Sequence, residues 1–533
     1  MKKAKKTLTI FSISLLTGIA LTSCNIYSIV HVGERKSSSV SLSKADSKAS
    51  SSDGANKGSY YLANDSAYLY GDVERSIDLA TVPSTGDVHL LAIPVEISGY
   101  SFSANFRTDL DHVLNGQGKT DTGYWESLAS FYEESSYGNL HLSFDIADTY
   151  DCGYTASELV DYDTKNGTPA ASEKVLNEAV ENIASVKGAD YLKQFDNDGD
   201  GWLDGIILIY SCPNYLANNN NKIYQIDKNG TFWAYTYWAR NDPNTARPTA
   251  NTYFWCSYDF LYEAVHSPKV DSHTLIHEFG HMMGLDDYYG MYDARGNQVS
   301  GYNPAGSSIM EDENICDHDA FSKYALGWLK PYVITGDSTI TITPSQDGGE
   351  GSAILIPSAS YNDTPFGEYL LLELYTPTGL NYLDSHVNYP SRPLGVDVSG
   401  IRMWHVDSRL ADILIDSKGN VSRYSYFTGD ELEDNHYYRV AATNSQKNAG
   451  FASNSAFDLL SLVDASGVKD FRNGDYAGRT TLFQSGNEFN PAAYKKYFTN
   501  KTAAWNDGTA LDFTISFDKV SEESATVTIE FTA

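Results

Sequence analysis

The spacing of apolar side chains predicts two differently built parts of the chain, which meet near Pro331. In the first part, residues 87–96 and 205–210 are almost continuously apolar and rich in branched side chains, which is typical of buried strands. Apolar and polar residues alternate over 140–146, as in a strand with one buried face, whereas 170–183 has helical composition and spacing. This part is therefore expected to mix helices and strands.

Beyond Pro331 the pattern is dominated by short runs of branched and aromatic residues, which are typical of strands. These runs lie at 339–343, 353–356, 369–374, 400–406 and 525–531. We therefore expect an α/β (α+β) domain at 61–335, followed by a β-rich C-terminal domain at 336–533.

The first residues have the order of segments found in an export signal. Lysines at positions 2, 3, 5 and 6 precede an apolar run at 8–20, which is too short to span a membrane comfortably. The run ends in LTSC at 21–24, which resembles the lipobox of bacterial lipoproteins. Residues 1–24 are therefore expected to be a lipoprotein signal peptide with Cys24 lipidated. Ordinary secretion with cleavage near Cys24 is the alternative.

A flexible tether is expected at 25–60, because this stretch is rich in Ser, Lys, Ala, Asp and Gly and has almost no large apolar side chains after position 35. Residues 59–82 could inhibit an enzyme or extend the tether. Acyl chains on Cys24 would hold the protein at a bilayer. The expected location is the outer face of the bacterial cell membrane, with the lipid anchor as the membrane contact.

The acidic composition limits the partners of the folded part. The chain has 38 basic and 69 acidic residues, a formal charge of −31, which argues against nucleic acid as a partner. The sequence GQGKT at 116–120 lacks the first glycine of a phosphate-binding loop, so no nucleotide is expected either. Cys152, Cys212, Cys256 and Cys316 are scattered singly, and their disulfide pairing stays open, as do free thiols.

The sequence HEFGH at 277–281 carries the clearest chemical pattern. On a helix, His277 and His281 lie one turn apart, with Cβ atoms about 5–6 Å from each other, so both imidazoles can bind one zinc ion. The apolar side chains at 275, 276, 279, 282 and 283 fall on the opposite side. Glu278 lies about 100° around the helix from His277, which suits a general base acting on a water at the metal.

A third protein ligand is expected, because catalytic zinc normally binds three side chains and leaves one position for water. Gly284 suits a left-handed helix end that turns the chain back, and Asp287 would then reach the ion. Zinc accepts a carboxylate in this position. Asp286 is the neighbouring alternative, and Glu311 or Glu313 would serve if the ligand came from a later segment.

Residues downstream of this helix are candidates for completing the site. Met310 is expected to form the hydrophobic floor below the metal that is called a Met-turn, and its alternative role is ordinary core packing. Tyr302, His318 and Tyr324 are candidate donors for the oxyanion that develops during peptide hydrolysis. The sequence does not rank these three.

An acidic loop at 196–204 predicts a structural calcium site. Asp196, Asp198, Asp200 and Asp204 occupy positions one, three, five and nine of the loop, and a glycine stands at position six. Trp202 would add its backbone carbonyl. Position twelve lacks the glutamate of a full EF-hand, so a regulatory switch is not expected. The alternative is a solvated acidic turn.

Six segments occur in a characteristic order: FYEESSYG at 131–138, FDNDGDGWLD at 195–204, HEFGHMMGLDDY at 277–288, AFSKYALGW at 320–328, EYLLLE at 368–373 and GIRMWHVD at 400–407. Together they resemble segments of the immune inhibitor A-type zinc metallopeptidases, from about residue 87 to the C-terminus. The resemblance implies a zincin-like catalytic domain, zinc and structural calcium, and an extracellular bacterial endopeptidase that acts on proteins.

The expected function is therefore zinc-dependent hydrolysis of peptide bonds at the cell surface, with Glu278 as the catalytic base. Two alternatives stay open. One is a surface binding protein with weak or no catalysis, against which the intact His277, Glu278 and His281 count. The other is a zinc hydrolase of a non-protein cell-surface substrate, because metal chemistry alone does not identify the bond that is broken.

Overall fold

The protein is mixed α/β, with a β-rich C-terminal region. The computed structural model describes residues 56–118, 126–215, 222–239, 241–262, 270–292, 298–302, 310, 316–387, 394–415, 421–429, 431–433, 436–444, 457–471, 475–498 and 501–532. Residues 1–55, with the predicted signal peptide and Cys24, lie outside this part. Within it, no helix combines the length and the apolar character that crossing a bilayer requires.

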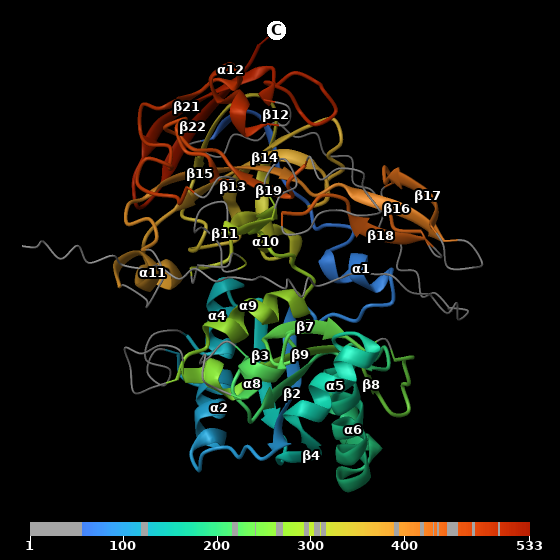
Figure 1. The fold of residues 1–533 in the computed structure, drawn as a ribbon. Helices are drawn as coiled ribbons and strands as arrows, with labels where there is room; N and C mark the ends of the chain where they lie inside the picture. The colour runs from blue at the N-terminus through green and yellow to red at the C-terminus, as the bar shows by residue number, and fades with distance from the viewer. Residues whose placement is uncertain are drawn as a thin grey trace, which may run out of the picture.

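A six-stranded sheet forms the centre of the first half (Figure 1). Its strands are β2 (Gly86–Ser98), β3 (Leu140–Ile146), β4 (Tyr150–Thr155), β6 (Ile206–Tyr210), β7 (Tyr235–Trp238) and β9 (Thr252–Ser257). The order is β3-β2-β6-β9-β7, and β4 also pairs with β2. Neighbouring strands are parallel, except that the edge strand β7 is antiparallel to β9.

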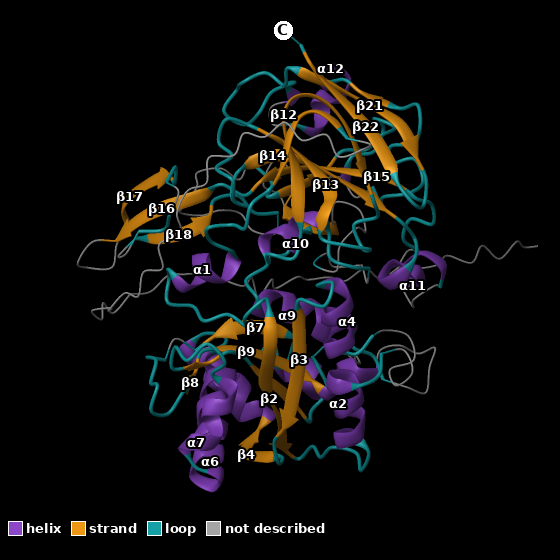
Figure 2. Ribbon diagram, turned by 180° about the vertical axis from the view of Figure 1, so that it is seen from behind, coloured by secondary structure: helices purple, strands orange, loops and turns teal. Residues whose placement is uncertain are grey.

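Helices cover both faces of this sheet (Figure 2). They are α2 (Phe106–Asn115), α4 (Leu128–Ser135), α5 (Ala156–Asn166), α6 (Ala170–Lys187), α7 (Ala189–Leu192), α8 (Lys222–Ile226) and α9 (His273–Met282). Helix α10 (Ala320–Ala325) instead contacts β14 (Glu368–Tyr375) of the second half. Successive side chains of β2 point to opposite faces, so Leu90 packs in the core with α2 and α4, and Leu91 in the core with α5 and α6. The half is thus a three-layer structure.

Shorter elements also occur before residue 303. They are the 3-10 turns η1 (Lys193–Phe195) and η2 (Tyr258–Tyr262), the pair β5 (Trp202–Leu203) and β8 (Thr249–Ala250), and the pair β10 (Gly290–Tyr292) and β11 (Gln298–Tyr302). The four cysteines Cys152, Cys212, Cys256 and Cys316 are buried and are free thiols. No disulfide therefore joins these four residues.

Two sheets build the second half. The larger has nine strands, namely β1 (Lys57–Leu62), β12 (Lys330–Ile342), β13 (Glu350–Pro357), β14 (Glu368–Tyr375), β15 (Gly400–Asp407), β19 (Leu460–Leu462), β20 (Glu488–Phe489), β21 (Phe513–Val520) and β22 (Ala525–Phe531). The smaller consists of β16 (Leu410–Ile415), β17 (Val421–Tyr426) and β18 (Tyr437–Val440). The short helical elements are α11 (Tyr382–His386), α12 (Pro491–Tyr494), η3 (Gly379–Asn381) and η5 (Lys495–Tyr497).

The N-terminal segment joins the two halves. Strand β1 pairs with β12 in the nine-stranded sheet, although it begins at Lys57, within the range predicted to be a flexible tether. Helix α1 (Tyr70–Arg75) follows and lies with α9 and α10 between the halves (Figure 1). Backbone pairing with β12 orders residues whose composition alone predicts flexibility.

Many sequence-based elements are confirmed. The expected strands at 87–96, 140–146 and 205–210 correspond to β2, β3 and β6, and the expected helix corresponds to α6. The five short strands expected beyond Pro331 correspond to β12, β13, β14, β15 and β22, with the first expected strand ending one residue after β12. The strand β12 crosses the predicted domain boundary at 335/336, because it belongs wholly to the C-terminal sheet.

Candidate metal centre

Helix α9 carries the two histidines and the glutamate of the HEFGH sequence. Leu275, Phe279 and Met282 are buried in the core that α9 shares with the sheet. Because these side chains occupy one side of the helix, His277 and His281 point to the other. Their ring centroids are 4.9 Å apart. The packing of the apolar side therefore fixes the direction of both imidazoles.

The chain reverses directly after α9. Gly284 has a φ of +102°, in the left-handed region that glycine adopts without strain. The amide of Leu285 donates to the carbonyl of Gly280 at 3.1 Å, and the amide of Gly284 donates to that of His281 at 2.9 Å. This pair of hydrogen bonds defines a Schellman helix end. The turn brings Asp287 back to the helix, as its spacing from Gly284 predicts.

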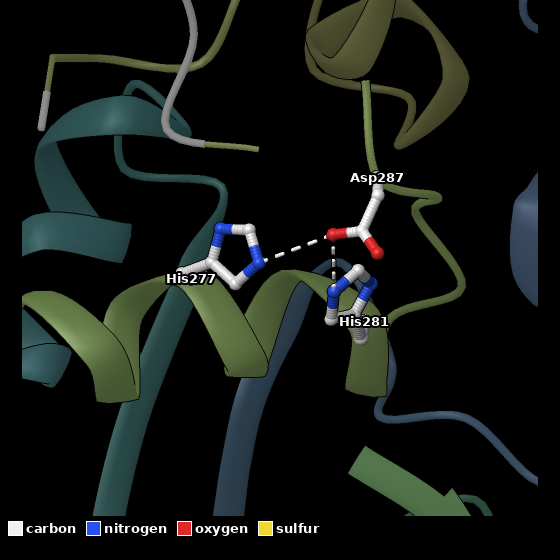
Figure 3. A group of neighbouring side chains, drawn as sticks. All are labelled: His277, His281 and Asp287. Carbon is white, nitrogen blue, oxygen red and sulfur yellow. Dashed lines mark ion pairs between the residues drawn. The ribbon is translucent and has the colours of Figure 1, made fainter. Parts of the chain in front are cut away.

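Three side chains converge beside α9 (Figure 3). The Oδ1 atom of Asp287 lies 3.3 Å from Nε2 of His277 and 3.1 Å from Nε2 of His281. One ligand atom from each residue lies within 4.8 Å of the other two. The structure therefore places two imidazole nitrogens and one carboxylate oxygen around a common point.

The alternative third ligands are placed differently. Asp286 directs one carboxylate oxygen to the hydroxyl of Thr443, at 2.8 Å, and the other to the backbone amide of Asp287, at 3.0 Å. Both oxygens of Asp286 thus have other partners, and Asp286 is not part of the cluster formed with the histidines. Glu311 and Glu313 lie outside the described residues.

The donor set fits a zinc ion. Oδ1 of Asp287 is buried, and the Nε2 atoms of His277 and His281 lie 3.3 and 3.1 Å from it, so a single cation could bind all three atoms. Nδ1 of His281 lies 2.7 Å from the carbonyl oxygen of Leu285, which fixes the proton on Nδ1 and leaves Nε2 free as a ligand. Two nitrogens and one carboxylate are a common ligand set for catalytic zinc.

Glu278 lies on the same helix and is 8% exposed. Its Oε2 atom is buried and has no hydrogen-bond partner among the residues described. Burial raises the pKa of its carboxyl group, and His281 and His277 partly oppose this effect. The hydroxyl of Thr236 donates to the backbone oxygen of Glu278 at 2.9 Å and so ties α9 to the edge strand β7. A carboxylate with these properties is suited to accept a proton.

Met310 packs directly against α9 at Gly280. A Cβ atom at position 280 would lie 2.3 Å from Sδ of Met310, so this close approach requires glycine. The backbone oxygen of Met310 accepts the amide of Tyr288 at 3.1 Å. Met310 therefore contacts both the helix and the segment that carries Asp287, as expected of a hydrophobic floor.

The three candidate oxyanion donors are no longer equivalent. The hydroxyl of Tyr324 is 2.9 Å from that of Tyr361 and is thus already engaged. The ring of His318 lies beside Gly280, its Cε1 atom 3.6 Å from the Cβ position there, and both ring nitrogens are buried without a hydrogen-bond partner in the part of the chain that the structure describes. The side chain of Tyr302 lies outside the described part.

The acidic loop brings together three of its predicted ligands. Carboxylate oxygens of Asp196, Asp198 and Asp204 lie within 4.8 Å of one another. Gly201 has a φ of +94°, which suits the sharp turn at position six. Oδ1 of Asp196 is buried and has no donor within the described part, and burial raises the pKa of Asp204 to about 7. These features fit a bound cation.

The other two predicted ligands behave differently. Asp200 accepts the backbone amide of Trp202 at 2.9 Å and lies 3.8 Å from Nε of Arg75, and it is not part of the carboxylate cluster. Trp202 begins β5, which pairs with β8. Arg75, from α1, also lies 2.9 Å from Asp198. A cationic side chain from the N-terminal segment thus contacts the rim of the loop.

The sequence analysis did not identify the residues that contact α9 and the Asp287 segment from distant parts of the chain. The amide of Val82 donates to the carbonyl of Met282 at the end of α9, at 2.8 Å. Thr443 and Asn444 contact the Asp287 segment although they are 157 and 156 positions away from their partners. Such contacts leave no periodic or local signal in the sequence.

The two clusters are the groups of metal-binding type that occur within the described residues. No protein-family model matches the chain, and no curated protein matches it. The interpretation of both clusters therefore rests on the residues and distances given above.

Proposed function

We propose that the protein is a zinc-dependent endopeptidase, exported and lipid-anchored through Cys24, that hydrolyses protein substrates at the bacterial cell surface. The observation that carries the proposal is the convergence of His277, His281 and Asp287, with a buried Glu278 on the same helix. These are the three ligands and the general base that zinc-assisted peptide hydrolysis requires. Export and the anchor rest on the sequence of residues 1–24.

The roles of the side chains follow from their placement. His277, His281 and Asp287 would hold zinc, which supplies a Lewis acid that acidifies water and polarises a peptide carbonyl. Glu278 accepts the proton of the attacking water and returns it to the leaving amine. Because burial raises the pKa of Glu278, this carboxyl group can both accept and release a proton closer to neutral pH than an exposed glutamate can.

The proposal includes a zincin-like fold for the first half and a structural calcium ion in the acidic loop. The position of α9 along the antiparallel edge strand β7 supports the fold. The cluster of Asp196, Asp198 and Asp204 supports calcium, whose preferred ligands are oxygens. The strongly acidic composition speaks against nucleic acid as a partner.

Cleavage of an unfolded protein by the purified protein tests the function. A chelator should abolish cleavage and zinc should restore it, because the ion supplies the Lewis acid. Glu278→Gln should keep bound zinc but lose about 10²- to 10⁴-fold in kcat, the usual contribution of a general base. Glu181→Gln, which changes an exposed glutamate on α6, is the matched control and should keep full activity.

The outcomes separate the alternatives. Full activity in zinc-loaded Glu278→Gln would remove Glu278 from the reaction. If the unaltered protein binds zinc but cleaves no protein, the peptidase proposal fails, and assays on cell-wall material distinguish a non-protein substrate from a binding protein without catalysis.

A further inference from the structure

The segment that carries Asp287 is held by the β-rich half. The hydroxyl of Thr443 donates to Oδ2 of Asp286 at 2.8 Å, and Nδ2 of Asn444 donates to the backbone oxygen of Tyr288 at 2.7 Å. These two contacts flank Asp287 on either side. Thr443 and Asn444 themselves lie between β18 and β19, in the chain that links the two C-terminal sheets.

Both N–H donors and the oxygen of the Asn444 amide group are engaged in hydrogen bonds. Nδ2 also donates to the carbonyl of Leu460 at 2.7 Å, and Oδ1 accepts the amide of Leu460 at 3.1 Å. An asparagine amide has two N–H donors, so one serves Leu460 and the other serves Tyr288. Rotating the amide by 180° would set its oxygen against two carbonyls, so the orientation is fixed.

Strand β19 links Asn444 to a rigid support. Leu460 opens β19, which pairs antiparallel with β15 in the nine-stranded sheet. Because Asn444 is hydrogen-bonded to β19, its contact with Tyr288 holds the proposed metal-binding turn in a fixed place relative to the nine-stranded sheet. A side chain on a free loop could not do this, because its own position would vary.

The contact with Thr443 engages Asp286, the aspartate next to Asp287. Oδ2 of Asp286 is taken by Thr443, and Oδ1 accepts the amide of Asp287 at 3.0 Å. The carboxylate of Asp286 is thereby held by Thr443 and by the backbone, while Oδ1 of Asp287 lies beside His277 and His281.

We propose that Thr443 and Asn444 are positioning residues for the third metal ligand, so that the β-rich half sets the metal affinity of the centre built on α9. This inference rests on the proposed zinc site. Groups that orient a ligand from outside the coordination sphere typically change metal affinity by about 10- to 100-fold when they are removed. Both halves of the protein thus contribute to one metal centre. The first half supplies the ligands, and the second half aligns the third ligand.

Zinc affinity of the full chain, measured by competition with a chromophoric chelator, tests this inference. Thr443→Val and Asn444→Ala should each weaken zinc binding about tenfold, while Thr443→Ser, which keeps the hydroxyl, should bind as the unaltered protein does. Thr341→Val is the matched control, because it removes a hydroxyl contact to Thr526, 3.0 Å long, elsewhere in the nine-stranded sheet. The visible spectrum of bound Co²⁺ should change in the first two variants and stay unchanged in Thr443→Ser and Thr341→Val.

The positioning role and the zinc site would be overturned by different results. Unchanged zinc affinity and an unchanged Co²⁺ spectrum in both Thr443→Val and Asn444→Ala would overturn the positioning role. It would also be overturned if these variants lowered only the unfolding temperature of the metal-free chain, as Thr341→Val would. Zinc binding that survives His277→Ala undiminished would instead overturn the zinc site itself.

Discussion

Zinc binding at His277, His281 and Asp287 should strengthen as the pH rises from 7 to 9. Burial alone would lower the pKa of His281, but the carboxylate of Asp287 outweighs this effect and raises that pKa to about 10. The same interaction holds the pKa of Asp287 below its ordinary value, although burial acts in the opposite direction. In the metal-free chain, the imidazole of His281 is therefore protonated over most of the physiological range.

The size of the pH effect on zinc binding follows from the proton on the imidazole of His281. An imidazole binds zinc only in its neutral form, and well below a pKa of about 10 the neutral fraction rises tenfold with each pH unit. The Kd for zinc should therefore fall about tenfold per pH unit, or about 1.4 kcal/mol, and about 100-fold between pH 7 and pH 9. Binding should release about one proton from His281.

The stability of the metal-free chain should change in the opposite sense. Because the folded pKa of His281, about 10, exceeds its ordinary value of 6.5, the protonated pair with Asp287 stabilises the fold fully below pH 6.5. This contribution is lost as the pH rises toward 10. In the zinc-loaded chain the ion takes the place of the proton, so this loss should be absent.

Competition with a chelator at pH 7, 8 and 9 measures the dependence, after correction for the protonation of the chelator. Calorimetry in two buffers of different ionisation enthalpy counts the released protons. Asp287→Asn removes the partner of His281 and should both weaken zinc binding and flatten its pH dependence. A Kd that stays constant between pH 7 and pH 9 in the unaltered protein would refute the reasoning.

Three further variants test the support of the centre. Gly284→Ala should lower the unfolding free energy by about 1–2 kcal/mol, because alanine is strained at this positive φ and its Cβ would lie 3.3 Å from Tyr70. Deleting residues 56–85 should leave a chain that is digested rapidly in limited proteolysis, since β12 loses the partner strand β1 and α9 loses its C-terminal contact. Asp317→Asn should cost about 3–5 kcal/mol in urea unfolding, because it leaves the ammonium group of Lys323, 0% exposed, without its carboxylate.

Each of these variants has a result that contradicts its premise. A Gly284→Ala protein as stable as the original would show that the turn tolerates other backbone angles. A chain without residues 56–85 that resists proteolysis and binds zinc normally would make this segment an accessory extension. An unchanged urea midpoint in Asp317→Asn would mean that other groups compensate the charge of Lys323.

Local sequence pattern was sufficient to predict the elements that carry the proposed metal ligands. His277 and His281 are placed by helical periodicity alone, and Gly284 marks the reversal that returns Asp287. The strands β2, β6 and β14 were equally predictable, because runs of branched residues in buried strands depend little on their surroundings.

Contacts between segments that are distant in the sequence could not be predicted from local pattern. Nothing in a serine- and lysine-rich stretch indicates that residues 57–62 pair with β12, because the partner lies hundreds of positions away. Arg75 at the acidic loop and Asn444 at the metal turn are likewise ordinary polar residues until the fold brings them there. The spacing from Gly284 indicated Asp287, but the hydrogen bond that engages the neighbouring Asp286 with Thr443 left no signal in the sequence.

The pairing of β1 with β12 also determines how the protein would respond to mechanical load. Along the chain, β1 precedes α1 and the Val82 contact with α9, so tension applied at the N-terminus reaches the β1–β12 hydrogen bonds first. Those bonds connect β1 to the nine-stranded sheet rather than to α9. With the proposed anchor at Cys24, a pull from the membrane would thus act first on the β-rich half, and the geometry around His277 and His281 would be unaffected until β1 had separated from β12.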